Sequence, residues 1–188
     1  MPSRHAIGRP AASFRPGGRK GARQPLLTCE KSSAALEFAL IAIPFFAMLI
    51  AIFATGLVFL SQQVLQTATT ETARLILTGQ AQLGGLTAAQ FQQDVCTNAG
   101  PLLPCSDIYV NVQTYSSFSS MSMLNPLQNG NFNQASMNYD LGGPGDIVLV
   151  QVFYEMPVLA GPLGFTLANM AGNDRLLQAT AVFRNEPY

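Results

Sequence analysis

One carboxylate stands at the start of a long apolar run, and its position calls for a chemical explanation. Glu37 directly precedes residues 38–60, which contain no charged side chain. A carboxylate drawn into a bilayer or a dry interface is costly unless a cation or hydrogen-bond donors stabilise it. Near a helix amino terminus, the macrodipole also favours a negative charge. The position of Glu37 therefore indicates charge pairing in a low-dielectric assembly, with a plain helix-terminus role as the alternative.

Groups that could carry out catalysis are scarce in the rest of the chain. The single histidine, His5, lies before the apolar run, so no serine–histidine or cysteine–histidine pair can form beyond that run. Asp140 and Asp146 flank a glycine-rich turn and could imitate a glycosidase pair or a calcium loop, but turn residues are the better interpretation. Residues 142–145 lack the Lys-Ser/Thr pair of a phosphate loop. We predict no catalytic residue, cofactor, metal site or small-molecule substrate.

Two cysteines have a spacing that suits a disulfide. Cys96 and Cys105 have eight residues between them and bracket the turn signal Asn98-Ala99-Gly100-Pro101. In an oxidising compartment such a pair can close a loop of ~10 residues, which stabilises a fold by roughly 2–3 kcal/mol. The alternative is a pair of unpaired thiols. Two cysteines alone are too few ligands for a structural metal site.

Positive charge is concentrated before the apolar run. Residues 1–36 carry seven basic side chains and one acid, a net charge of +6, whereas the residues after Glu37 carry −5. The 23 residues of the run would form a helix of about 35 Å, enough to cross a hydrocarbon core of ~30 Å. The run is too long for a signal-peptide core, so we predict a retained single-pass span. The positive-inside rule places the amino terminus in the cytoplasm and residues from about 61 outside it. A basic arm beside a span does not indicate nucleic-acid binding.

The elements that must position these residues follow from composition and periodicity. Residues 1–32 are rich in Gly, Pro and Arg and are predicted to be a disordered cytoplasmic leader. Residues 33–78 are predicted to form a transmembrane and shaft helix that bends at Pro44 and stops near Gly79. Beyond the span, this helix has an apolar stripe made of Val64, Leu65, Ala68, Thr72, Leu75 and Ile76.

Residues 79–188 are predicted to form an exported α+β domain. A capping box at Thr87-Ala88-Ala89-Gln90 predicts a short helix. Strands are predicted at residues 107–115, 146–156 and 177–184. Residues 116–140 are expected to be a long exposed loop with a hairpin at Asn129-Gly130, and residues 158–170 a loop with a short helix. Strands that follow one another without long helices favour an antiparallel sheet, so the predicted fold is α+β and pilin-like, with the long helix packed on a small sheet.

The segment around Glu37 resembles the cleavage site of prepilin-type precursors. It reads Lys31-Ser32-Ser33-Ala34-Ala35-Leu36-Glu37-Phe38-Ala39-Leu40. In such precursors a glutamate is the fifth mature residue and an aromatic residue, here Phe38, follows it. Counting back from Glu37 places the cut between Ser32 and Ser33. The new amino group on Ser33 would then lie one helical turn before Glu37 on the same face.

Together with Thr72-Ala73-Arg74 and the closing segment 179–188, this segment resembles the TadE/TadF-like pseudopilins of the tight-adherence (Flp, type IVc) pilus system. The resemblance covers residues ~31–78 well and the last two strands in part. It implies a minor pseudopilin of the bacterial inner membrane, cut by a prepilin peptidase, whose partners are other pilins, pseudopilins and pilus assembly proteins. Ser32 stands where family members usually have glycine. The alternative is an uncleaved single-pass anchor that presents a periplasmic binding domain.

Overall fold

The computed structural model describes residues 30–158, 161 and 164–188, with side chains from Ala34 onward. The predicted basic leader lies outside these residues, except for Glu30, Lys31 and Ser32. The chain divides into two compact units, Met1–Ala42 and Ile43–Tyr188, which are treated separately. The described part of the first unit is helical throughout. The second unit contains the sheet.

The longest helix, α1 (Glu30–Leu77), runs without interruption through Pro44. In its threonine-rich stretch, the hydroxyl groups donate hydrogen bonds to backbone carbonyls one turn back. Thr69 Oγ1 donates to the Leu65 carbonyl at 2.7 Å, and Thr72 Oγ1 donates to the Ala68 carbonyl at 2.9 Å. These bonds satisfy two hydroxyls that are fully buried against the rest of the second unit.

Residues near the end of the sequence pack against the carboxyl end of α1. Gly79 adopts φ 76°, the left-handed conformation that ends many helices. The ring of Tyr188 occupies the space that a Cβ at Gly79 would need. The Glu186 amide donates to the Leu77 carbonyl at 2.9 Å, which satisfies one of the last helical carbonyls.

Short helices connect α1 to the sheet. After α2 (Gln80–Leu83), α3 (Ala88–Ala99) begins with the predicted capping box, which the structure confirms. The Thr87 amide donates to Gln90 Oε1 at 2.9 Å, and the Gln90 amide donates to Thr87 Oγ1 at 3.3 Å. Single-turn 3-10 helices of the described residues include η2 (Gly100–Leu102), η3 (Cys105–Asp107), η4 (Phe118–Ser120) and η5 (Gln134–Ser136).

Three antiparallel strands form the main sheet in the order β1-β4-β5. They are β1 (Ile108–Tyr115), β4 (Ile147–Pro157) and β5 (Asp174–Arg184), so the last strand begins three residues earlier than predicted. A separate hairpin joins β2 (Leu127–Gln128) to β3 (Asn131–Phe132). Its turn residues Asn129 and Gly130 have φ of 52° and 78°, as a type I′ turn requires, and this confirms the predicted hairpin.

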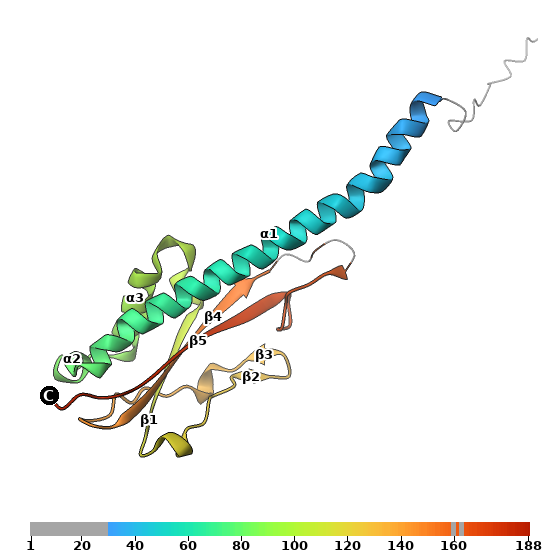
Figure 1. The fold of residues 1–188 in the computed structure, drawn as a ribbon. Helices are drawn as coiled ribbons and strands as arrows, with labels where there is room; N and C mark the ends of the chain where they lie inside the picture. The colour runs from blue at the N-terminus through green and yellow to red at the C-terminus, as the bar shows by residue number, and fades with distance from the viewer. Residues whose placement is uncertain (1–29, 159–160, 162–163) are drawn as a thin grey trace, which may run out of the picture. The chain divides into compact units, whose positions relative to one another are not determined.

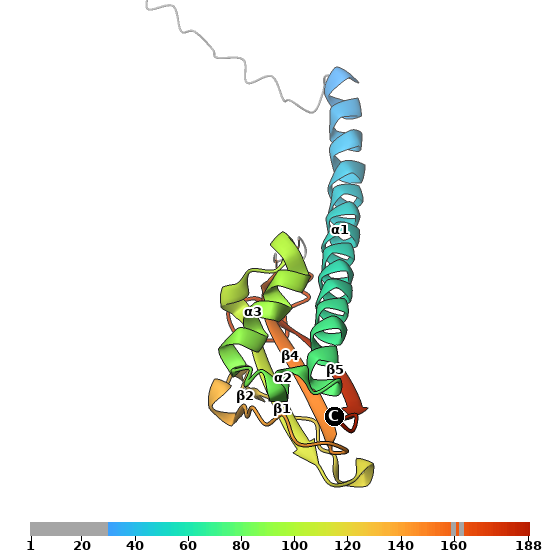
Figure 2. The ribbon, with the colours of Figure 1, turned by 90° about the vertical axis from the view of Figure 1, so that its left-hand side faces the viewer.

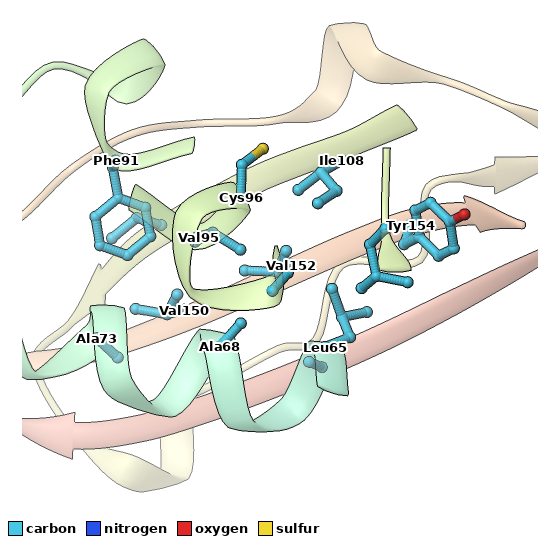
Figure 3. Packing of buried hydrophobic residues seen from close by; sticks show 14 of the residues in the cluster. Leu65, Ala68, Ala73, Phe91, Val95, Cys96, Ile108, Val150, Val152 and Tyr154 are labelled. Atoms are coloured by element: carbon cyan, nitrogen blue, oxygen red, sulfur yellow. The ribbon is translucent and has the colours of Figure 1, made fainter. Parts of the chain in front are cut away.

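The helices α1 and α3 cover one face of the main sheet, with α1 running along β5 (Figures 1 and 2). Figure 3 shows the buried side chains that meet between these layers. They come from α1 (Leu65, Ala68, Ala73), from α3 (Phe91, Val95, Cys96) and from the sheet (Ile108, Val150, Val152, Tyr154). The apolar stripe predicted on the second half of α1 is therefore the contact surface for the sheet.

Fourteen of the 25 residues in the predicted loop 116–140 are exposed, but other parts of this segment cover the opposite face of the sheet, which the sequence did not predict. The Phe132 ring lies 4.6 Å from that of Tyr109, measured between ring centroids. Asn111 and Gln151 are fully buried, and Asn111 Nδ2 donates to Gln151 Oε1 at 3.1 Å. The side chain of Gln151 also bonds to the backbone of Leu124. The Leu124 amide donates to Gln151 Oε1 at 3.1 Å, and Gln151 Nε2 donates to the Leu124 carbonyl at 3.2 Å. These polar bonds hold the segment against the sheet.

Two glutamine side chains of α1 form hydrogen bonds with backbone groups on the outer edge of β5. Gln66 Nε2 donates to the Thr180 carbonyl at 3.1 Å, and the Thr180 amide donates to Gln66 Oε1 at 3.3 Å. One turn earlier, Gln62 Nε2 donates to the Gln178 carbonyl at 2.8 Å. An open strand edge invites pairing with other chains, so these two glutamines both attach α1 to the sheet and protect its edge.

Candidate processing site and membrane helix

The predicted cleavage position lies in the first turns of α1. Ser32 and Ser33 follow Glu30, the first helical residue, so the peptide bond between them belongs to the helix. Glu37 and Phe38 are exposed, Phe38 to 71 %. Ser33 and Glu37 are four positions apart on one helix, which places them on the same face with a rise of about 6 Å between them. An amino group created at Ser33 would therefore come within ion-pairing reach of the Glu37 carboxylate.

The first half of α1 presents large apolar side chains to its surroundings. Fourteen of them between Leu36 and Leu60 are 46–73 % exposed. The helix between Ala34 and Leu77 is long and apolar enough to cross a bilayer, and no residue of its most apolar window is buried within the described structure. These properties are compatible with a single-pass membrane protein.

Contact between α1 and the sheet region begins before the predicted span ends. Val58 is only 8 % exposed, although it lies inside the apolar run 38–60. A cleft of about 140 Å³ separates Ala54, Leu57 and Val58 of α1 from the residues around the end of β4. Sequence periodicity missed this contact because every residue of the run is apolar, so no stripe distinguishes a face that meets protein from one that meets lipid.

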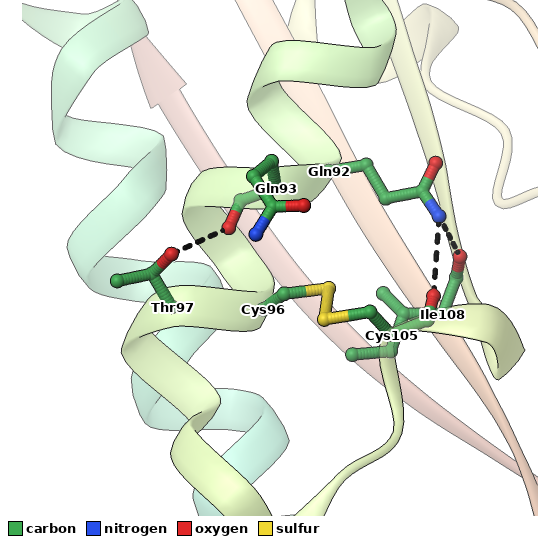
Figure 4. The surroundings of a disulfide bond; sticks show 6 residues. All are labelled: Gln92, Gln93, Cys96, Thr97, Cys105 and Ile108. Carbon is green, nitrogen blue, oxygen red and sulfur yellow. Dashed lines mark hydrogen bonds between the residues drawn. A yellow bond between two sulfur atoms is a disulfide. The ribbon is translucent and has the colours of Figure 1, made fainter.

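A disulfide joins Cys96 of α3 to Cys105 of η3, as predicted, with 5.4 Å between the two Cα atoms. Figure 4 shows a second link beside it: Gln92 Nε2 donates to the carbonyls of Cys105 and Ile108, at 3.3 and 2.8 Å. Cys96 is buried and Cys105 is exposed. The disulfide and the amide together hold the end of α3 to the start of β1.

The titratable groups of the sheet region respond to burial. Burial raises the pKa of Glu155, and the nearby carboxylates of Asp107 and Asp174 raise it further. Burial also raises the pKa of Tyr139 to about 12, with a smaller contribution from Asp94. The Tyr139 hydroxyl donates to the Leu86 carbonyl at 3.1 Å, so its polar end is satisfied.

The two aspartates considered for catalysis hold turns. The Gly142 amide donates to Asp140 Oδ1 at 3.1 Å, and the Gly143 amide donates to Asp146 Oδ2 at 2.7 Å. Thr114 also donates to Asp140. Among residues 30–158, 161 and 164–188, no group of three or more His, Cys, Asp or Glu side chains could hold a metal ion.

Comparison with known proteins finds a similarity over part of α1. Residues 33–74 match the model of a family described as TadE-like protein, which confirms over that segment the resemblance seen in the sequence. No curated protein and no solved structure matches the chain. The family match and the candidate membrane-spanning helix fit a membrane protein associated with a tight-adherence pilus.

Proposed function

We propose that this chain is a minor pseudopilin-like membrane protein that supports assembly of a tight-adherence (Flp) pilus, in a structural rather than an enzymatic role. One observation carries the proposal. The family match begins at residue 33, and counting back from Glu37 makes that same residue the first of the mature chain. The match thus starts where a processed subunit would start.

In this proposal a prepilin peptidase cuts between Ser32 and Ser33 on the cytoplasmic face of the inner membrane. The amino group of Ser33 then becomes a cation beside Glu37, on the same chain or on a neighbour. An ion pair of this kind stabilises a carboxylate that moves into the low-dielectric interior of a helical assembly. The sheet region remains on the other side of the membrane and faces other pilus components.

The exposed apolar side chains of α1 supply the assembly surface. In the bilayer they contact lipid, and lateral packing on the helices of pilins or pseudopilins would exchange lipid contacts for protein contacts. Such packing carries little hydrophobic driving force, so a charge pair at the end of the helix would contribute much of the specificity. Glu37 is therefore the residue whose loss should harm assembly most.

Replacing the carboxylate tests this role. Glu37→Gln keeps the size of the side chain and removes its charge. We expect the variant to insert normally but to reduce the number of surface pili at least about tenfold, because the helix loses the proposed ion pair. Electron microscopy would count the pili, and immunoblots of membranes would check insertion.

Glu71→Gln is the matched control, because Glu71 is an exposed carboxylate on the same helix and forms a long ion pair of 4.0 Å with Arg74. An exposed pair of this kind contributes little, so this variant should make normal pili. Normal pilus numbers in the Glu37→Gln strain would contradict the charge-pairing role.

A further inference from the structure

The connection between β4 and β5 packs against α1 at a level that belongs to the predicted span. The cleft of about 140 Å³ described above is lined on one side by α1 and on the other by four residues from the end of β4 and the connection: Met156, Pro157, Val158 and Leu167. All of these side chains are apolar. The sheet region therefore reaches the part of α1 that lipid is expected to surround.

The composition of the connection suits contact with lipid. No charged residue occurs between Glu155 and Asp174. Phe165 is 39 % exposed, and its carbonyl accepts a bond from the Gly161 amide at 2.7 Å. The connection thus presents an exposed aromatic side chain two positions before Leu167, which lines clefts together with Leu57 and Phe59 of α1.

The length of the helix sets the depth of the connection. Val58 lies twenty-one positions after Glu37, and a helix advances about 32 Å over that many positions, close to the ~30 Å thickness of a hydrocarbon core. With Glu37 at one boundary of the core, Val58 lies at the other boundary and Ala54 lies about 6 Å inside it. The residues packed on Ala54 and Val58 must then meet the bilayer.

We propose that the β4–β5 connection, through Val158, Phe165 and Leu167, is a second membrane contact that rests in the bilayer interface on the side opposite Glu37. The interface is the suitable depth, because irregular backbone exposed to the hydrocarbon core would leave polar groups unsatisfied. Aromatic side chains are favoured at that depth. The contact goes beyond the proposed pilus role, although it does rest on α1 spanning the membrane.

Arg175 supports the interfacial depth. Its Nη1 donates to the Leu167 carbonyl at 2.7 Å, which ties the connection to β5. Its side chain also lines a second cleft, of about 180 Å³, together with Thr55 and Phe59 of α1. A guanidinium at this level is well placed for the phosphate groups of lipids, whereas the hydrocarbon core would disfavour it.

Tryptophan fluorescence tests the contact, because the chain has no tryptophan and each substitution provides a single reporter. Three variants of the full chain would be reconstituted in phosphatidylcholine vesicles that contain bromine-labelled lipids. Phe165→Trp reports on the connection, and Phe46→Trp, in the middle of the apolar run, reports on the span. Phe118→Trp is the matched control: it replaces another exposed phenylalanine, in η4 next to the end of β1 that pairs with the start of β4. The eleven-residue strand β4, about 35 Å long, thus separates Phe118 from the connection.

We expect lipids labelled near the headgroup to quench the Phe165→Trp variant at least about twofold more than the Phe118→Trp variant, as an interfacial aromatic side chain requires. Equal, weak quenching of these two variants, with strong quenching of Phe46→Trp, would overturn the second contact and leave the span intact. Weak quenching of Phe46→Trp would instead contradict the span and, with it, the proposed pilus function. Thr166→Trp, at a neighbouring exposed position, provides a second reporter if Phe165→Trp does not fold.

Discussion

Two carboxylates, Glu37 and Glu155, carry the predictions at the scale of single residues. Glu37 lies at the start of an apolar helix, where a lipid or protein environment would penalise an ion without a cation nearby. Glu155 lies on β4 opposite Leu176, close to the carboxylates of Asp107 and Asp174. Glu37 is proposed to pair with a new amino terminus, whereas the ionisation of Glu155 reduces the stability of the fold.

The raised pKa of Glu155 predicts a pH-dependent effect of its replacement. A carboxyl group with a folded pKa above its unfolded value of 4.5 is destabilising once it ionises, so the penalty is absent below pH 4.5 and complete above the folded pKa. We expect Glu155→Gln to raise the midpoint of thermal unfolding by about 1–3 °C at pH 7, and the gain should vanish below pH 4.5. Circular dichroism of the full chain in detergent measures both values.

Glu186→Gln is the control for this prediction, because it makes the same chemical change at an exposed carboxylate. Its effect should stay within about 0.5 kcal/mol, as for most surface substitutions. A gain for Glu155→Gln that is the same at pH 4 and pH 7 would show that charge is not its cause.

At the scale of elements, the seam between α1 and β5 is the contact most open to a direct test. Gln66→Ala removes two hydrogen bonds to Thr180, and we expect a loss of about 1–3 kcal/mol from the free energy of unfolding. Gln63→Ala is the matched control, since Gln63 is an exposed glutamine on the same helix, three positions away. Denaturant titration of both variants, with circular dichroism as the signal, measures the difference. Equal stability of the two variants would mean that the seam contributes nothing to the attachment of the helix.

Elements with local causes could be predicted from the sequence. The capping box at Thr87 and Gln90 and the turn at Asn129-Gly130 depend on residues within a few positions of one another, and the structure contains both. The apolar stripe of α1 and the alternation in β1 also identified the helix–sheet core. In each case, residues close in sequence determine the geometry.

Elements whose partners are distant could not be predicted. In the sequence, Asn111 has the pattern of a solvent-facing residue on a half-buried strand. Its hydrogen-bond partner Gln151 lies 40 positions away, so the sequence alone does not indicate that Asn111 is buried. In the sequence, Gln62 and Gln66 likewise have the pattern of polar residues on an exposed helix face, because their partners on β5 lie more than 110 positions away. Polar side chains show these roles only when the fold brings their partners together.

At the scale of the whole molecule, the proposed cut would change the charge of the protein. The full chain is neutral, whereas residues 33–188 carry three basic and nine acidic side chains, a net charge of −6. Removal of the basic leader would thus release a distinctly acidic subunit. It would also remove the positive charge that orients the precursor in the membrane, at a stage when orientation is already established.

The mass of the mature protein tests the central claim most directly. The chain would be isolated from membranes of cells that make it, with and without an active prepilin peptidase, and analysed by intact mass and by amino-terminal peptides. We predict a chain that begins at Ser33 when the peptidase is active and a chain that retains residues 1–32 when it is absent. A chain that keeps its leader while the same peptidase processes a major pilin would contradict the pseudopilin account and favour an uncleaved membrane anchor.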